Sequence, residues 1–307
     1  MKIAYLIFAH NQPAHFQRLV KALDSEHVSF FIHVDQKSDI KAFQNSGFGN
    51  NVHFVESRHL VHHGGFSQVQ SMMSLLAAAA AEADAQYFIT LSGWDYPIKN
   101  NQQIHDFLNQ NFPMNFMNFY PLVGDADLVD NIRKYNFLEY IYLAPGFLHK
   151  PLKAFKILIS KLPIRRSFIP GMVPYRGSNW FCLNRKTVDY INDFLQTPQG
   201  KNYIEYFKLV LCPDEIFFQT LVLNSPYAKD CRYYDRDITH STGIMKNENK
   251  AYLHYIDWNP KRENPTQLNL SDFDQLKNSD ALFARKFNET KSKELLDAID
   301  QKILNRG

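Results

Sequence analysis

The N-terminal third of the chain alternates short apolar segments with segments of helical periodicity. Ile3–Ala9, Phe30–Asp35 and Tyr87–Gly93 are apolar runs of strand length, and Pro13–Leu23 and Gln68–Ala83 carry helical patterns between them. This alternation predicts βαβ units and a mainly parallel sheet flanked by helices, so the expected fold class is α/β. In sheets of this kind, ligands bind at the carboxyl ends of the strands.

The composition is that of a globular protein and excludes some classes of partner. Of the 307 residues, 45% are hydrophobic and 21% are charged, as in ordinary folded domains. A formal net charge of +3 is too small to predict a nucleic-acid partner. Three cysteines without a CxxC pair favour a reducing compartment, and no apolar run is long enough to span a bilayer. We therefore expect a cytoplasmic protein.

The sequence lacks the signatures of the common nucleotide and metal sites. It has neither GxGxxG nor GxxxxGK[ST], which disfavours dinucleotide-binding and P-loop proteins. A nucleotide-sugar enzyme of this topology would place a metal-binding Asp-x-Asp after Tyr87–Gly93, where Asp95 stands alone. A divalent cation at a diphosphate normally needs such carboxylates, so we expect no metal and no cofactor. The Asp-x-Asp triplets elsewhere lie in polar or less structured segments: Asp125/Asp127, Asp235/Asp237 and Asp272/Asp274.

Two carboxylates and two cations stand in apolar surroundings far apart in the sequence. Pro213, Asp214 and Glu215 precede an apolar run, a pattern typical of the first turn of a buried helix. The helix dipole favours ionised carboxylates there, whereas burial beside aromatic rings raises their pKa. The acids either stabilise the helix start or supply a general base. Arg285 and Lys286, between phenylalanines, can stabilise a departing diphosphate.

Two further segments fall at predicted strand ends. Asp35 closes the second strand, where it can accept hydrogen bonds from a ribose or a uracil, or begin a turn. His63 and Gly64 belong to a His-His-Gly-Gly segment whose glycines allow the backbone to approach a ligand closely. The adjacent histidines lack the spacing of a zinc site. Both segments are therefore candidates for ligand contacts that need no metal.

The middle of the chain, from about residue 121 to 174, is predicted to be less regular. It contains the basic stretch Lys150–Arg166, in which lysines and arginines alternate with apolar residues. This pattern suits docking on an anionic membrane surface near a lipid-linked substrate. It equally suits a solvated helix face with its core stripe. Both interpretations remain open at this stage.

Taken together and in order, the motifs resemble the core-2/I-branching β-1,6-N-acetylglucosaminyltransferase and peptide O-xylosyltransferase family. The resemblance covers nearly the whole chain. The segments that carry it are Ala4–Leu6, His33–Ser38, His63–Ser67, Leu91–Ile98, Gly177–Phe181, Pro213–Phe218 and Phe283–Phe287. His63 replaces an aromatic residue often seen before the two glycines. The membrane anchor, stem and disulfides of animal members are absent, which suggests a bacterial cytoplasmic relative.

The resemblance implies a Rossmann-like nucleotide-sugar glycosyltransferase fold of the GT-A type. It implies one domain, 1–307, with a nucleotide-binding half over 1–120 and an acceptor-binding and catalytic half over 121–307. It also implies a UDP-sugar donor, inversion at the anomeric carbon and no obligatory metal. Glu215 takes the role of catalytic base, and Arg285 and Lys286 grip the diphosphate. Asp214 is left a capping or orienting role.

The same resemblance supplies the remaining expected contacts. Trp258 and Arg133 are expected to face the acceptor. The residues expected around the nucleotide and donor sugar are Ala9, His10, Asp35, His63, Gly64, Asp95, Asn179 and Trp180.

The expected reaction is transfer of a sugar, N-acetylglucosamine first among the candidates, from UDP to a glycan or lipid-linked glycan. Capsule, lipopolysaccharide or another glycoconjugate is the expected product, with possible peripheral contact to the inner membrane. Transfer of xylose or glucose is the nearest alternative. A non-catalytic module that binds UDP-sugars or glycans is the alternative from another class. A two-carboxylate glycosidase is less well supported, because no second acid shares the setting of Glu215.

Overall fold

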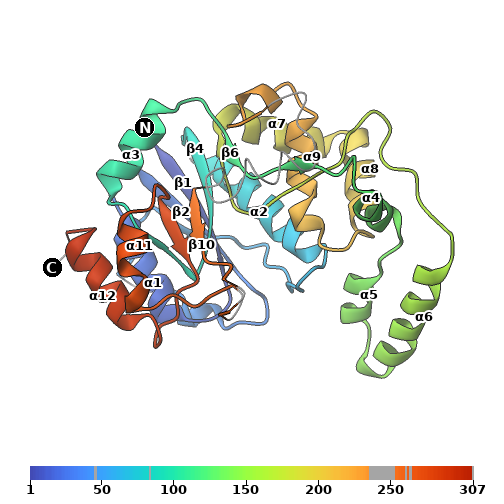
Figure 1. Ribbon diagram of the computed structural model, residues 1–307, viewed down its shortest axis with the longest axis horizontal. Coiled ribbons are helices and arrows are strands. Elements are labelled where there is room, and N and C mark those ends of the chain that lie inside the picture. The colour runs from blue at the N-terminus through green and yellow to red at the C-terminus, as the bar shows by residue number, and fades with distance from the viewer. Residues whose placement is uncertain (45–46, 83, 235–252, 260, 263–264, 306–307) are drawn as a thin grey trace.

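The centre of the protein is a six-stranded sheet with helices on both faces (Figure 1). The computed structural model describes residues 1–44, 47–82, 84–234, 253–259, 261–262 and 265–305. The strand order is β3-β2-β1-β4-β9-β6, with β1 to β4 parallel and β9 antiparallel to its neighbours. The mainly parallel α/β fold predicted from the sequence is confirmed. The strands are β1 (Ile3–Ala9), β2 (Val28–Val34), β3 (Val52–Phe54), β4 (Tyr87–Ser92), β6 (Phe116–Met117) and β9 (Phe181–Asn184).

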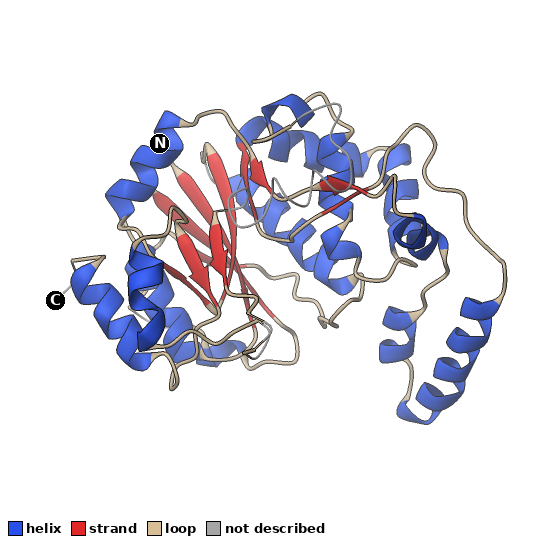
Figure 2. Cartoon of the chain, viewed as in Figure 1, coloured by secondary structure: helices blue, strands red, loops and turns tan. Residues whose placement is uncertain are grey.

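The central strands are apolar throughout because both of their faces are buried. Along β1, Tyr5 packs into one core and Leu6 into the other, as the alternation of side chains in a strand requires. The helices over the first core are α1 (Pro13–Leu23), α3 (Asn101–Gln110) and α12 (Lys293–Lys302). Those over the second core are α2 (Ser67–Glu82), α7 (Arg185–Gln196), α8 (Pro198–Phe207) and α9 (Phe217–Leu223). Figure 2 shows the two helical layers.

The C-terminal segment returns to the N-terminal strands through a second, small sheet of order β10-β11-β5. Its strands are β5 (Asp95–Pro97), β10 (His254–Ile256) and β11 (Phe283–Arg285). Phe283 and Leu296 belong to the same core as Tyr5. A boundary near residue 120 therefore does not divide the chain into separate packing units.

The middle of the chain is more helical than the sequence indicated. It contains α4 (Ala126–Arg133), α5 (Leu138–Leu143) and α6 (His149–Lys161). The basic stretch Lys150–Arg166 is helical up to Lys161, but α6 carries no buried side chain among those described, so the core stripe of the second interpretation is absent there. No described helix is long and apolar enough to cross a bilayer. The remaining elements are β7 (Tyr120–Pro121), β8 (Tyr175–Arg176), α11 (Phe273–Lys277), η1 (Ile40–Ala42), η2 (Gly146–Leu148), η3 (Pro213–Glu215), η4 (Ala228–Asp230) and η5 (Leu270–Asp272).

The packing of α12 predicts that the C-terminus contributes to global stability. Leu296 on α12 is 2% exposed within the core that also holds β1. We expect Leu296→Ala to lower the free energy of unfolding by about 2–4 kcal/mol in urea denaturation. Gln301→Ala, on the exposed side of the same helix, should change it by less than about 0.5 kcal/mol. Equal, small effects of both substitutions would show that α12 is not part of this core.

Candidate active site

A cavity of about 1020 Å³ lies at the edge of the main sheet where its parallel strands end. Ala9 and His10 reach it from the end of β1, Asp35 from the end of β2, and Ser92 and Trp94 from the end of β4. This is the edge at which sheets of this class bind their ligands. The cavity therefore lies where the order of the strands places a ligand.

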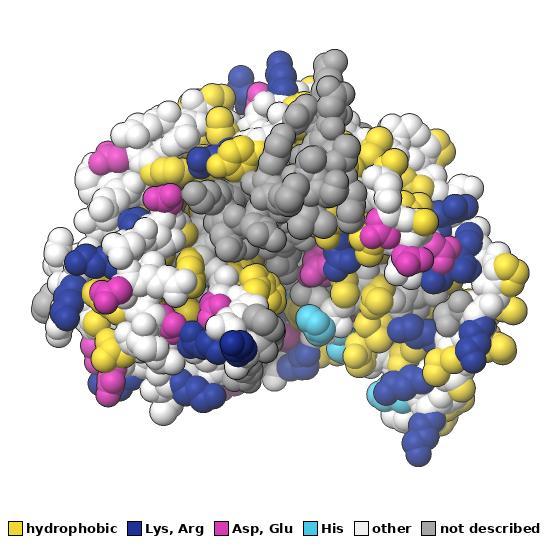
Figure 3. Space-filling model, in the orientation of Figure 1, with side chains coloured by type: hydrophobic (Ala, Val, Ile, Leu, Met, Phe, Trp, Pro, Cys, Tyr) yellow, Lys and Arg dark blue, Asp and Glu magenta, His cyan; other side chains and the backbone are white. Residues whose placement is uncertain are grey.

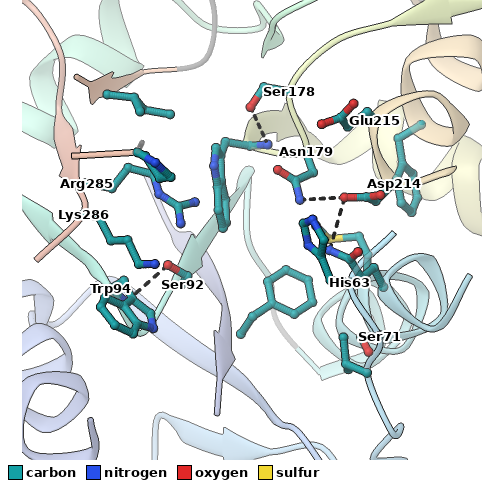
Figure 4. Close-up of a pocket in the computed structure, with 18 of the residues that line it drawn as sticks. His63, Ser71, Ser92, Trp94, Ser178, Asn179, Asp214, Glu215, Arg285 and Lys286 are labelled. Atoms are coloured by element: carbon teal, nitrogen blue, oxygen red, sulfur yellow. Dashed lines mark hydrogen bonds between the residues drawn. The ribbon is translucent and has the colours of Figure 1, made fainter. Parts of the chain in front are cut away.

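Two cations and two carboxylates face this cavity from different elements. Arg285 and Lys286 come from the end of β11, and Asp214 and Glu215 come from η3. Figure 4 shows the basic pair on one side of the pocket and the acidic pair on the other, with Asn179 between them. Glu215 and Arg285, which are 70 positions apart in the sequence, thus line the same cavity from opposite sides.

The basic pair is held in place by aromatic faces. The guanidinium carbon of Arg285 lies 4.3 Å from the ring centroid of Trp180, and Lys286 Nζ lies 4.1 Å from that of Trp94. Cation–π contacts of this kind stabilise the charge without neutralising it. These contacts restrict the orientation of both cations at the cavity wall.

Asp95 acts behind the wall of the cavity and does not line it. Its side chain is fully buried and accepts hydrogen bonds from the amide and hydroxyl of Ser92. Arg285 Nε lies 3.6 Å from Asp95 Oδ1, and His254 Nε2 lies 3.5 Å from Oδ2. Burial alone would raise the pKa of Asp95, but the Arg285 charge and the His254 hydrogen bond lower it. The expected donor contact is thus replaced by a structural role, the positioning of Arg285.

Asp214 is the more enclosed of the two carboxylates. Its Oδ2 accepts hydrogen bonds from Gln68 Nε2 at 3.2 Å and from Asn179 Nδ2 at 3.1 Å. Its Oδ1 is buried without a hydrogen-bond partner in the described part of the chain. Burial, together with the charge of Glu215, raises the pKa of Asp214 to about 7. Asp214 is therefore an amide-bound carboxyl group that exchanges its proton near neutral pH, and it caps no helix.

Glu215 is more open and is paired with a cation. Its Oε2 accepts hydrogen bonds from Arg176 Nε at 2.9 Å and from Arg176 Nη2. The carboxylate side chain is 36% exposed and lines the cavity. The amide of Gly177 donates to the Glu215 carbonyl at 2.8 Å and fixes the backbone beneath it. Arg176 was not identified from the sequence, because a single arginine before Gly-Ser has no distinctive spacing.

The helix predicted to begin at Pro213 begins later. Pro213–Glu215 forms the 3₁₀ turn η3, Ile216 has φ −128°, and α9 runs from Phe217 to Leu223 with every residue buried. The interruption has a physical cause: the Glu215 carbonyl accepts from Gly177 and is not available to the helix. The dipole of α9 therefore does not govern the two acids directly. For Asp214 burial dominates, and its pKa rises.

Comparison with known proteins identifies the family. The family model of the Core-2/I-Branching enzymes matches residues 3–277. The chain belongs to this family. It is similar to xylosyltransferase 2 of Rattus norvegicus, with 28% identity over 98% of this chain and 33% of the relative. It is also similar to the β-glucuronosyltransferase GlcAT14A of Arabidopsis thaliana, with 28% identity over 100% of this chain and 65% of the relative.

The chain matches only part of the length of these relatives. The human xylosyltransferase 1 is 28% identical over 98% of this chain and 30% of its own length. The chain thus spans about a third of the length of the xylosyltransferases it matches. The described fold, a mainly parallel sheet between helical layers with its cavity at the strand ends, is the GT-A-like fold of the family.

In this family member, the strand-end residues predicted from the sequence meet at the cavity. Asp35 lines it while its Oδ1 accepts from the amide of Lys37 at 2.9 Å, so Asp35 both begins a turn and faces the ligand edge. Lys37 Nζ lies 3.5 Å from Asp35 Oδ2. The ring of His10 stacks on Trp94, with centroids 6.3 Å apart. His10 therefore helps to hold the ring of Trp94, which lies beneath Lys286.

In this member of the Core-2/I-Branching family, the His-Gly-Gly segment contacts the cavity wall that carries Asp214 and Glu215. His63 lines the cavity. Gly64 adopts φ +73°, which favours glycine. Its carbonyl accepts from the amide of Cys212, and its amide donates to Gln68 Oε1. Gly64 thus connects the segment to η3 through backbone contacts and does not itself line the cavity, contrary to the expected donor contact.

The two expected acceptor residues have different positions in the fold. Trp258 lines the cavity and is 58% exposed. Arg133, at the end of α4, does not line the cavity; its Nε donates to the Arg166 carbonyl at 2.9 Å. The structure therefore gives Arg133 a role in holding α4. The lining residues that the sequence did not indicate include Gln68, Asn118, Tyr120 and Arg176.

Within the described residues, the carboxylates form no metal site. No group of three His, Cys, Asp or Glu side chains gathers there in a way that could hold an ion. Asp125 caps α4, and Asp272 forms an ion pair with Arg262. The triplet Asp235/Asp237 lies outside the described residues. Among the described residues, the Lys and Arg side chains that line the cavity are Arg285 beside Trp180, Lys286 beside Trp94, Lys37 beside Asp35, and Arg176 beside Glu215.

The raised pKa of Asp214 predicts a pH-dependent stability. Between its ordinary value and about 7, the native state keeps a proton that the unfolded chain has lost, so the free energy of unfolding falls as pH rises through this window. Asp214→Asn should remove this loss and be more stable than wild type at pH 8 by about 1–4 kcal/mol, but not at pH 4. Urea denaturation at both pH values measures it.

The control for this experiment is Asp193→Asn on the exposed side of α7. The difference between this variant and wild type should not grow between the two pH values. A similar pH dependence in Asp193→Asn, or its absence in Asp214→Asn, would refute the assignment of the shifted pKa to Asp214.

Proposed function

We propose that this chain is an inverting glycosyltransferase that moves a sugar from a UDP-sugar to a hydroxyl group of a glycan. One observation carries the proposal: a fixed cation pair and a carboxylate pair face each other across one cavity at the ligand edge of the sheet. A sugar–diphosphate donor needs both groups. The cations meet the leaving diphosphate, and a carboxylate meets the attacking hydroxyl.

On the cation side, Arg285 and Lys286 stabilise the negative charge that develops on the departing diphosphate. The faces of Trp180 and Trp94 and the buried carboxylate of Asp95 fix their orientation before the substrate binds. Pre-organised charge is effective because little reorganisation is needed during the reaction. We therefore propose that the enzyme works without a divalent metal ion.

On the carboxylate side, Glu215 accepts the proton of the acceptor hydroxyl. The oxygen attacks the anomeric carbon as the bond between this carbon and the diphosphate oxygen breaks, so the configuration inverts in a single displacement. Arg176 holds Glu215 Oε2 and orients the group. Oε1 is the oxygen assigned to receive the proton. The exposure of Glu215 to the cavity suits contact with an acceptor that enters from solvent.

Asp214 is a second candidate for the same proton. Its pKa of about 7 lies near the working pH, which is where a general base is most effective. Its Oδ1 is enclosed, however, with no hydrogen-bond partner among the described residues, and its Oδ2 is bound to two amides. Glu215 is favoured because its carboxylate is accessible to the acceptor. Matched substitutions separate the two assignments.

The identity of the donor sugar is a separate part of the proposal. The sequence resemblance suggests N-acetylglucosamine, whereas the relatives are named as xylosyltransferases and a glucuronosyltransferase. UDP-xylose, UDP-glucuronic acid and UDP-glucose therefore belong in the same test. A cavity of about 1020 Å³ lies at the upper end of the range for ligand sites and is compatible with donor and acceptor together. Slow hydrolysis of each UDP-sugar, which needs no acceptor, identifies the donor.

Glu215→Gln should lower the transfer rate by about 10²–10⁴-fold, because it removes the proton acceptor and keeps the shape of the side chain. The Kd for UDP, measured by calorimetry, should change less than about threefold. Asp214→Asn should keep more activity than Glu215→Gln, and Glu205→Gln, on the exposed face of α8, serves as control. Wild-type turnover in Glu215→Gln would exclude Glu215, and loss of activity in Asp214→Asn alone would move the role there.

Removal of divalent metal tests the role of the cations. Excess EDTA should leave the transfer rate within about twofold of that of untreated enzyme, whereas Lys286→Met should lower it by about 10²-fold through loss of charge at the diphosphate. Lys291→Met, an exposed lysine near the same strand, is the control. Loss of activity in EDTA and its recovery with Mn²⁺ would contradict metal independence.

A further inference from the structure

The helices α5 and α6 form a hairpin that projects away from both cores (Figure 1). The rings of Phe137, just before α5, and Phe155 on α6 lie 6.0 Å apart, and the two helices contact each other along the hairpin. Among the described side chains of α6, none is buried. We call residues 138–162 the α5–α6 hairpin. No described side chain of α6 is packed into either core.

This hairpin exposes more large apolar side chains than a solvated helix pair requires. Leu143 and Phe147 at its tip are 59% and 79% exposed, and Phe155, Ile157 and Leu158 on α6 are about half exposed or more. Single exposed apolar residues are common, but a group of them on one projecting element marks a contact surface. This group of side chains therefore forms a surface suited to contact with an apolar partner.

The same hairpin is strongly cationic. Between Glu139 and Asp189 the sequence contains no aspartate or glutamate. Lys150, Lys153 and Lys161 are exposed on α6, and none of them pairs with a carboxylate of the described chain. Figure 3 shows lysine and arginine side chains interspersed with hydrophobic ones on this projection. The partner must accept positive charge as well as apolar side chains.

The two properties are arranged along α6 by its helical periodicity. Phe155 and Leu158 are spaced three residues apart and share one side of α6, and Leu162 follows directly after the helix, four residues beyond Leu158. Lys150 and Lys161 lie on the adjoining side. Apolar side chains bordered by lysines are the pattern of helices that lie in the interface of an anionic bilayer. The exposed tip at Phe147 extends the apolar side beyond the start of α6.

We propose that the α5–α6 hairpin is a docking element for an anionic lipid bilayer. Its apolar side enters the interface, and its lysines contact the phosphate groups of the lipids. A second copy of this chain fits poorly, because it would bring one cationic hairpin against another. A soluble anionic glycan would satisfy the lysines but leave Phe147 and Leu158 in water. A bilayer satisfies both requirements.

The hairpin is connected to the wall of the cavity. Glu139 on α5 accepts from the amide and hydroxyl of Ser67 at 3.1 and 3.0 Å and lies 3.0 Å from His62 Nδ1. The ring of Tyr142 stacks on His62 with centroids 4.6 Å apart. His63, the next residue, lines the cavity. Docking would hold the cavity close to the lipid surface, which, resting on the proposed function, suits an acceptor attached to a lipid.

Flotation of the whole chain with vesicles tests the docking without any measurement of catalysis. We expect binding to phosphatidylcholine vesicles that contain about one third phosphatidylglycerol, weaker binding at high salt, and little binding to phosphatidylcholine alone. Leu143→Ser/Phe147→Ser and Lys150→Glu/Lys153→Glu/Lys161→Glu should each lower partitioning onto the anionic vesicles at least about tenfold.

Matched controls separate the hairpin from general effects of charge and hydrophobicity. Lys201→Glu/Lys229→Glu/Lys277→Glu changes the net charge equally at exposed sites elsewhere, and Leu270→Ser removes an exposed apolar residue outside the hairpin. Both should bind vesicles as wild type does, and thermal unfolding should confirm that all variants are folded.

Three outcomes would overturn the proposal. They are equal binding of wild type to neutral vesicles, undiminished binding of either hairpin variant, and a wild-type dimer in sedimentation that Leu143→Ser/Phe147→Ser converts to a monomer. Because none of these measurements involves sugar transfer, failure here is distinguishable from failure of the proposed function.

Discussion

The arrangement of the site depends on the buried ion pair between Asp95 and Arg285. Asp95 on β5 pairs in register with Arg285 on β11, so a strand from the end of the chain is attached beside the end of β4. A fully buried carboxylate needs a charged partner and hydrogen bonds. Arg285 supplies the charge, Ser92 donates the hydrogen bonds, and His254 Nε2 lies 3.5 Å away. This interaction brings Lys286 to the cavity and fixes its neighbour against Trp180.

The opposite wall depends on backbone contacts that hold η3. The Gly64 carbonyl accepts from Cys212, and the Glu215 carbonyl accepts from Gly177. These bonds place two adjacent acids in different surroundings: Asp214 among amide groups in an enclosed position, and Glu215 beside Arg176 and open to the cavity. Neighbouring carboxylates in unlike environments can take separate roles.

Some features could be predicted because they depend on local sequence. The bounds of Ile3–Ala9 and Pro13–Leu23 match the strand and the helix residue for residue, since a short continuous apolar run and an amphipathic helical pattern differ clearly. The placing of Asp35 at the cavity followed from its position at a strand end. The helix start at Pro213 was misplaced because the bond from Gly177 to Glu215 joins residues 38 positions apart. No local pattern reports such a bond.

The sequence by itself determined the α/β class, the edge at which the cavity lies, and the presence of an acidic and a basic pair. Only the tertiary structure decided what each charged residue does. Asp95 proved to support Arg285 from behind the wall, Arg133 lies away from the cavity, and Arg176 joins Glu215. The physical reason is that periodicity and strand ends are encoded over a few neighbouring residues, whereas burial and pairing of a charge depend on groups that meet only when distant segments pack.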